Sequence, residues 1–236
     1  MAYQILHPNA APVQGVLFDL DGVILDSEKL YARFWAEACA FFGYQMTYQQ
    51  ALGACSLSKA DMQRYLTGLF GPDIVYDDVY DKRVELMDAY THEHAIDAKP
   101  GVGTLLDYLQ EHRIPYAITT SSPHDRVQCY LERLDLYRRF PYVCTTRETA
   151  KGKPEPDIYL LGAKNISVPP ENCLALEDSH TGLLSAYRAG CMASVVPDLE
   201  EPGENILSIA YARFDSLLDV IPLLEEKAGK SGSVRN

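Results

Sequence analysis

Short apolar runs alternate along most of the chain with stretches of helical periodicity. The first run, residues 13–19 (VQGVLFD), is continuous, as expected for a strand buried on both faces of a parallel sheet. Later apolar runs predict strands at 115–119, 142–144, 173–176 and 191–196. The stretches between them predict helices at 101–112, 124–135, 156–164 and 180–189. Such alternation indicates βαβ units, and therefore an α/β domain built on a parallel sheet.

The region 29–97 interrupts this alternation. It carries long helical patterns, at 29–43, 58–70 and 77–95, and no run typical of a buried strand. Pro100-Gly101 then marks the return to the βα pattern. We therefore predict a core domain made of residues 1–28 and 98–236, with a helical domain, 29–97, inserted after the first strand. The polar end of the chain, EKAGKSGSVRN, is expected to be a frayed tail.

The charge of the chain narrows the classes of partner. Its 236 residues carry a formal net charge of −12, which argues against binding to nucleic acid or to an anionic membrane surface. A small phosphorylated metabolite remains possible, because one local cation and a metal ion can override the overall field. No segment is long and apolar enough to span a membrane, and MAYQILHPNAAPVQ lacks the features of a secretory signal. We expect a cytoplasmic protein, either a monomer or a weak homo-oligomer.

The six cysteines do not change this picture. They are widely spread, and none forms a C-x-x-C pair of the kind found in zinc ribbons and redox motifs. We expect reduced thiols without a role in the chemistry.

Two acids follow the first predicted strand. Asp19 and Asp21 are one residue apart, so in an extended chain they project to the same side. Two carboxylates so close repel each other unless a proton or a cation lies between them, an arrangement that suits metal-assisted phosphoryl transfer. The alternative is an Asp-Gly turn with solvated acids.

Three further polar interruptions occur where other predicted strands end. Thr120 and Ser121, in TTSS, offer hydroxyls and amides to phosphate oxygens, or they simply cap a helix. Lys153, in GKPEPD, can neutralise phosphate charge, or it is a solvated surface lysine with Lys151 as a rival. Glu177-Asp178 can complete an oxygen-ligand site for magnesium, or form an ordinary acidic turn. Because strands of a parallel sheet share their carboxyl edge, the four interruptions together predict one site.

The motifs FDLDGV, ITTSSP, KGKPEPDIY and LALEDSHTGLLSAYRAG, together with the helical insertion, resemble the haloacid-dehalogenase-like hydrolase superfamily in its β-phosphoglucomutase-like branch. The resemblance covers nearly the whole chain. It implies a Rossmann-like core and a cap, 29–97, that closes over the substrate. It also implies a magnesium-dependent phosphatase that acts on a small phosphorylated metabolite such as a sugar phosphate.

The resemblance assigns a role to each candidate residue. Asp19 would be the nucleophile that forms an aspartyl-phosphate, and Asp21 the general acid and base. Thr120 and the Ser121 amide would bind the phosphate, and Lys153 would bridge nucleophile and phosphate. The Mg²⁺ ligands would be the carboxylates of Asp19 and Asp178 and the main-chain carbonyl of Asp21, with Glu177 as an adjacent ligand or as an acid supporting that set.

Two alternatives to a phosphatase stay open. A β-phosphoglucomutase-type mutase shares the core, but the histidine and arginine expected in its cap align near Tyr31 and Leu57, which do not match. Lys59 is a possible substitute for the arginine. The other alternative is a silent homologue that only binds ligands, and the intact acids and lysine speak against it. Dehalogenation is disfavoured, because dehalogenases of the superfamily lack an aspartate at the position of Asp21.

Overall fold

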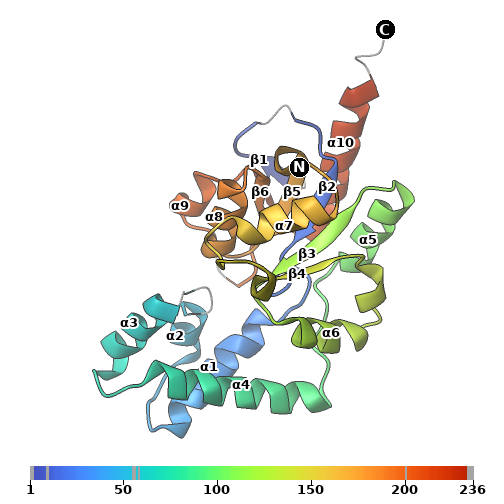
Figure 1. Cartoon of the computed structure of the whole chain (residues 1–236). Coiled ribbons are helices and arrows are strands. Elements are labelled where there is room, and N and C mark those ends of the chain that lie inside the picture. The colour runs from blue at the N-terminus through green and yellow to red at the C-terminus, as the bar shows by residue number, and fades with distance from the viewer. Residues whose placement is uncertain (1–2, 9–10, 55–56, 58, 200, 233–236) are drawn as a thin grey trace. The chain divides into compact units, whose positions relative to one another are not determined.

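The structure is a computed structural model that describes residues 3–8, 11–54, 57, 59–199 and 201–232 (Figure 1). The chain divides into two compact units. The first combines Met1–Leu25 with Ala98–Asn236, and the second is Asp26–Asp97. We call them the core unit and the helical unit.

The core unit is built on a seven-stranded sheet in the order β1-β7-β6-β5-β2-β3-β4. All neighbouring strands are parallel except β1, which runs antiparallel to β7 at the edge. The strands are β1 (Tyr3–Ile5), β2 (Gly15–Phe18), β3 (Tyr116–Thr120), β4 (Val143–Thr145), β5 (Cys173–Glu177), β6 (Met192–Val195) and β7 (Ala212–Phe214). The predicted α/β class with a Rossmann-like parallel sheet is confirmed.

Helices flank this sheet (Figure 1). The α-helices of the core unit are α5 (Val102–Glu111), α6 (His124–Glu132), α7 (Asp157–Asn165), α8 (His180–Arg188), α9 (Glu204–Leu207) and α10 (Val220–Gly232). Short 3₁₀ turns join them to the strands: η1 (Tyr137–Arg139), η2 (Thr146–Glu148), η3 (Pro170–Asn172) and η4 (Leu217–Asp219).

The central strand β2 is buried on both faces, as its continuous apolar run predicts. Leu17 belongs to an apolar cluster that includes Ile158 of α7 and Leu183 of α8. Phe18, on the opposite face, meets Tyr116 and Phe140 edge-on, with ring centroids 6.3 and 6.0 Å apart. Packing on both faces holds the end of β2, where Asp19 follows, in a defined position.

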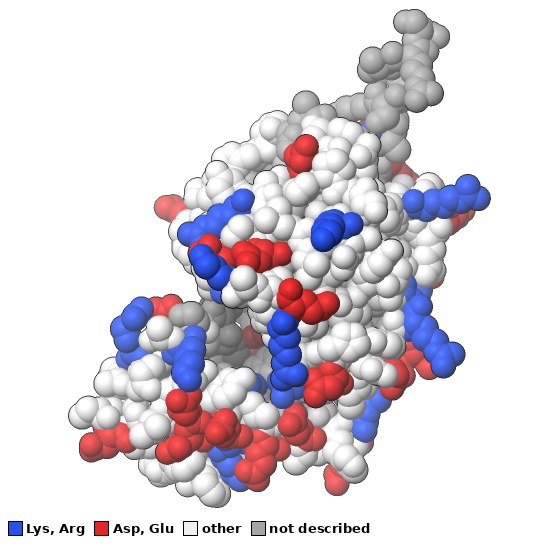
Figure 2. All heavy atoms as spheres, viewed as in Figure 1, with Lys and Arg blue, Asp and Glu red and all other residues white. Residues whose placement is uncertain are grey.

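The helical unit contains α1 (Glu28–Phe41), α2 (Tyr48–Leu52), α3 (Lys59–Phe70) and α4 (Tyr76–Glu93). Its own apolar core includes Trp35, Met62 and Leu66. Acidic side chains gather over α4 on the face shown in Figure 2, and Lys and Arg residues are interspersed among them. The described atoms of that face form no continuous basic surface of the kind that nucleic acid requires.

One buried cation of the helical unit has an unusual environment. Arg83 of α4 is 5% exposed, and its guanidinium carbon lies 4.9 Å from the ring centroids of both Tyr31 and Tyr80 and 5.3 Å from that of Trp35. Its Nε is buried without a hydrogen-bond partner. Among the described residues, the structure gives this guanidinium aromatic neighbours and no carboxylate partner.

The structure differs from the sequence-based predictions in several elements. Helices α2 and α9 were not predicted, because they have only five and four residues and carry little helical periodicity. Strands β1 and β7 were not predicted, because each has three residues with a polar residue in the middle, Gln4 or Arg213, and therefore forms no apolar run. The frayed tail was predicted from residue 226 onward, yet α10 continues to Gly232. The buried side chains of Val220, Leu223 and Leu224 anchor that helix, and it extends into the polar end from there. Residues 233–236 lie outside the described part of the chain.

No helix in the described ranges combines the length and the apolar character that crossing a membrane requires.

Candidate active site

The predicted site residues come from neighbouring strands. Asp19 follows β2, Thr120 ends β3, and Glu177 ends β5 with Asp178 directly after it. Strand β2 lies between β3 and β5 and is parallel to both (Figure 1). These residues therefore meet at the carboxyl edge of the sheet, where ligands of open α/β sheets bind.

A buried lysine joins two of the acids. Lys153 Nζ donates to Asp19 Oδ1 and to Glu177 Oε1, both at 2.6 Å, and to the main-chain oxygen of Thr119 at 3.1 Å. The side chains of Lys153 and Asp19 are 7% and 11% exposed, and that of Glu177 is fully buried. In this structure Asp19 and Lys153 are therefore buried and paired with each other, and neither is a solvated surface residue.

The structure also separates the two candidate lysines. Lys151 is 68% exposed, and its only ion pair among the described residues is with Glu155, at 3.9 Å. The turn 152–156 instead directs Lys153 toward the end of β2, so Lys153 is the lysine that contacts Asp19.

The hydroxyl turn after β3 contacts the second acid. Ser122 Oγ donates to Asp21 Oδ2 at 2.8 Å, and the Ser122 amide donates to Thr120 Oγ1 at 3.0 Å. Thr120 is buried, and Ser121 beside it is exposed. The alternative that this turn caps a helix is wrong, because Pro123 occupies the N-cap of α6 and no side-chain cap bond forms there.

Three carboxylates lie close enough to share a cation. Oxygens of Asp19, Glu177 and Asp178 are all within 4.8 Å of one another. Gly22, with φ +76°, makes room for Asp178, since a Cβ at position 22 would lie 1.9 Å from Asp178 Oδ2. This oxygen-only donor set, with one lysine among several acids, is of the kind that Mg²⁺ accepts.

Burial and charge set the protonation of the group. Burial is the main cause that raises the pKa of Asp19 to about 7. The positive charge of Lys153 acts to lower this pKa, and the negative charges of Glu177 and Asp21 act to raise it. Burial alone would lower the pKa of Lys153, but Asp19 and Glu177 outweigh it and raise that pKa, so the lysine stays charged. Burial, followed by the charge of Glu177, raises the pKa of Tyr159 well above its ordinary value, so its hydroxyl stays protonated.

Sequence reasoning missed three residues at the site. Ser122 was part of the TTSS run but was not assigned a contact, although its hydroxyl binds Asp21. Tyr159 donates to Glu177 Oε1 at 2.5 Å, and its place in a helical apolar pattern carries no sign of that contact. Gly182 leaves the space that Glu177 occupies, since a Cβ there would lie 2.0 Å from Glu177 Oε1.

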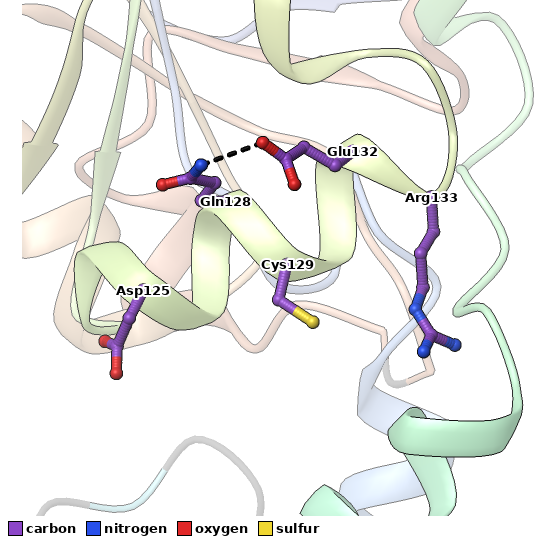
Figure 3. A pocket seen from close by; sticks show the side chains of 5 residues that line it. All are labelled: Asp125, Gln128, Cys129, Glu132 and Arg133. Atoms are coloured by element: carbon purple, nitrogen blue, oxygen red, sulfur yellow. Dashed lines mark hydrogen bonds between the residues drawn. The ribbon is translucent and has the colours of Figure 1, made fainter.

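A separate surface hollow of about 390 Å³ lies along α6. Figure 3 shows the side chains that line it, including the exposed thiol of Cys129 and the bond from Gln128 Nε2 to Glu132 Oε1, 2.8 Å long. It contains none of the acids or the lysine described above, so it is not the candidate active site.

Known proteins resemble this chain in sequence and in fold. Hexitol phosphatase A of Escherichia coli is 34% identical over 181 residues, which are 75% of this chain and 80% of that protein. Beta-phosphoglucomutase of Bacillus subtilis is 26% identical over 189 residues, 77% of this chain and 82% of the relative. A hydrolase structure from Deinococcus radiodurans, with bound phosphate and sodium, matches with a TM-score of 0.77 and 26% identity over 92% of this chain and 97% of that one.

The family model described as haloacid dehalogenase-like hydrolase matches residues 16–196. That span begins in β2, just before Asp19, and ends just after β6, so it includes every acid of the site as well as Lys153. The chain belongs to the haloacid dehalogenase-like hydrolase family.

Proposed function

We propose that this protein is a magnesium-dependent phosphatase that hydrolyses a small phosphorylated metabolite, a sugar phosphate, through an aspartyl-phosphate on Asp19. The observation that carries the proposal is the bridge from Lys153 Nζ to Asp19 Oδ1 and Glu177 Oε1, at 2.6 Å each, at the carboxyl edge of the sheet. The phosphatase named among the relatives acts, by its name, on a hexitol phosphate, which supports the substrate class.

Asp19 acts as the nucleophile, and Asp21 acts as the general acid and base. An oxygen of Asp19 attacks phosphorus, the bond from phosphorus to the ester oxygen breaks, and Asp21 gives a proton to the departing alcohol. In the second half, Asp21 takes a proton from water as that water attacks the phosphorus of the acyl phosphate. Inorganic phosphate leaves, and the Asp19 carboxylate is regenerated. The bond from Ser122 Oγ to Asp21 Oδ2 orients Asp21 for both proton transfers.

The remaining residues of the site bind the phosphoryl oxygens and offset their negative charge. Lys153 stays close to the phosphoryl oxygens and offsets the negative charge that develops on them. Thr120 and the Ser121 amide hold those oxygens at the end of β3. Mg²⁺, bound by Asp19 and Asp178 with Glu177 nearby, would supply further charge neutralisation for the phosphoryl group.

A phosphate-release screen tests the proposal. Purified protein is incubated with Mg²⁺ and a panel of sugar phosphates, nucleotides and small acid phosphates, and inorganic phosphate is measured. We expect release from at least one sugar phosphate. No release across the whole panel would refute the phosphatase and favour a homologue that only binds ligands.

A sugar-phosphate mutase is the second candidate function, and one observation favours it: beta-phosphoglucomutase of Bacillus subtilis is 26% identical to this chain over 189 residues. A mutase needs a cation for the second phosphate of its bisphosphate intermediate. Lys59, the substitute considered above, is paired with Asp77 at 2.5 Å. Incubation of β-glucose 1-phosphate with a bisphosphate activator separates the functions, since a mutase yields glucose 6-phosphate and a phosphatase yields free phosphate.

The proposed setting is the cytoplasm, with the protein a monomer or a weak homo-oligomer. The described cysteines, Cys39, Cys129, Cys144, Cys173 and Cys191, are all free thiols, which suits a reducing compartment. We further propose that residues 29–97 act as the cap that selects the substrate.

A further inference from the structure

The hydroxyl of Tyr159 lies in the interior of the candidate active site. Tyr159, on α7, is completely buried, and its hydroxyl donates to Glu177 Oε1 at 2.5 Å. The same carboxylate oxygen accepts from Lys153 Nζ at 2.6 Å, and Nζ lies 5.3 Å from the centroid of the Tyr159 ring. Both lone pairs of Oε1 are therefore engaged, one by the tyrosine and one by the lysine.

Glu177 is held from its other sides as well. Its Oε2 accepts from Ser179 Oγ at 3.1 Å, and the carboxylate fits against α8 only because Gly182 has no side chain there. A fully buried carboxylate cannot replace a lost donor with bulk water, so each of these bonds limits its orientation. Glu177 is thus a fixed acceptor for Lys153.

The ammonium of Lys153 uses its three protons on three fixed acceptors. These are Asp19 Oδ1, Glu177 Oε1 and the main-chain oxygen of Thr119. Asp19 is the proposed nucleophile, and its carboxylate loses its negative charge when it forms the acyl phosphate. The attraction of Lys153 to Asp19 then weakens, so the orientation of Glu177, the remaining charged acceptor, decides where the charge of Lys153 lies.

We propose that Tyr159 is a positioning residue, which fixes Glu177 and through it the ammonium of Lys153 beside the phosphoryl group. This inference rests on the proposed phosphatase function and adds to it a residue that does not touch the substrate. Tyr159 differs from Lys153, the other donor to Glu177 Oε1, in carrying no charge, so it orients the carboxylate without neutralising the negative charge that a metal ion requires.

The variant Tyr159→Phe tests this role, with Tyr116→Phe as its matched control. Tyr116 is another buried tyrosine of the core unit, and its hydroxyl is hydrogen-bonded to Gln110 and to the Arg139 carbonyl, away from the acids. Because Lys153 acts on charge that develops in the transition state, we expect Tyr159→Phe to lower kcat about tenfold or more and to change KM little. Tyr116→Phe should leave both constants unchanged, although each variant loses a buried hydrogen bond.

A spectroscopic signal reports on the lysine without turnover. The buried ammonium of Lys153 should give a proton–nitrogen NMR signal that is absent from Lys153→Met. We expect Tyr159→Phe to shift or broaden this signal and Tyr116→Phe to leave it in place. In the Lys153→Met background, Tyr159→Phe should lower kcat no further, because the residue through which it acts is gone.

The outcomes separate this inference from the proposed function. If the wild-type protein releases no phosphate from any substrate, the proposed function fails, and the NMR signal alone decides the role of Tyr159. If the wild type is active and Tyr159→Phe keeps its kcat, the positioning role is overturned whatever the signal does. An unchanged Lys153 signal in Tyr159→Phe also overturns it.

Discussion

Gly22 and Asp178 occupy complementary space at the carboxyl edge of the sheet. A Cβ on residue 22 would lie 1.9 Å from Asp178 Oδ2, and the φ of Gly22 is +76°. Gly22 therefore has two roles: it adopts the backbone conformation of the turn after Asp21, and it leaves room for Asp178, which lies about 150 residues later in the chain.

We expect Gly22→Ala to abolish most activity, because the new methyl group must displace the Asp178 carboxylate. Phosphate release should fall about 100-fold or more, with a loss of about 1–3 kcal/mol in the free energy of unfolding. Gly190→Ala is the control, since Gly190 has φ +84° but an empty space around the new Cβ. Gly190→Ala should lose a similar amount of stability, because it suffers the same kind of backbone strain, but it should keep its kcat. Equal kcat values for the two variants would contradict the structural argument.

The proposed nucleophile is tested by Asp19→Asn. The amide has nearly the shape of the carboxylate but cannot form the acyl phosphate, so turnover should be undetectable in the phosphate-release assay. Circular dichroism establishes that the variant is folded. Turnover by a folded Asp19→Asn protein would rule out Asp19 as the nucleophile.

The two lysines of the third motif form a matched pair. Lys153→Ala should lower kcat about 100-fold or more, because it removes the buried charge that is paired with Asp19, the proposed nucleophile. Lys151→Ala should leave kcat within about twofold, since Lys151 is exposed and its pair with Glu155 is 3.9 Å long. The assignment fails if the Lys151 variant is the impaired one.

The stability of the folded protein should depend on the proton bound to Asp19. Without metal, its pKa is about 7, well above the usual 3.8, so the folded protein binds a proton there that the unfolded chain has released. The ionised group thus destabilises the folded state above pH 7, and this penalty shrinks as the pH falls from 7 toward 4. In metal-free buffer, the stability advantage of Asp19→Asn over the wild type should be largest near pH 8 and decrease toward pH 5. Thermal unfolding of both proteins between pH 5 and pH 8 measures this advantage. An advantage that grows as the pH falls would contradict the prediction.

Magnesium should be required, and its affinity should depend on Asp178. Chelation with EDTA is expected to remove phosphate release, and added Mg²⁺ to restore it. Asp178→Ala should raise the Mg²⁺ concentration for half-maximal activity about tenfold or more, because one of the three clustered carboxylates is lost. Full activity in EDTA would exclude a metal-dependent reaction.

Much of the site could be predicted from local patterns. The apolar run ending at Asp19, the hydroxyls after β3 and the acids after β5 each mark the end of a strand, and parallel strands share one carboxyl edge. Strands β1 and β7 could not be predicted in the same way, because each has three residues with a polar residue in the middle, Gln4 or Arg213, and therefore forms no apolar run.

The sequence by itself determined the fold class, because strands and helices that alternate give a local pattern of apolar and polar residues. It also predicted a helical insertion and a set of candidate residues. Only the tertiary structure decided which lysine meets Asp19, that Ser122 binds Asp21, and that Tyr159 shares an oxygen of Glu177 with Lys153. Those contacts join residues 18 to 134 positions apart. The physical reason is that a side chain's partner is set by how the strands and helices pack together, which no short stretch of sequence specifies.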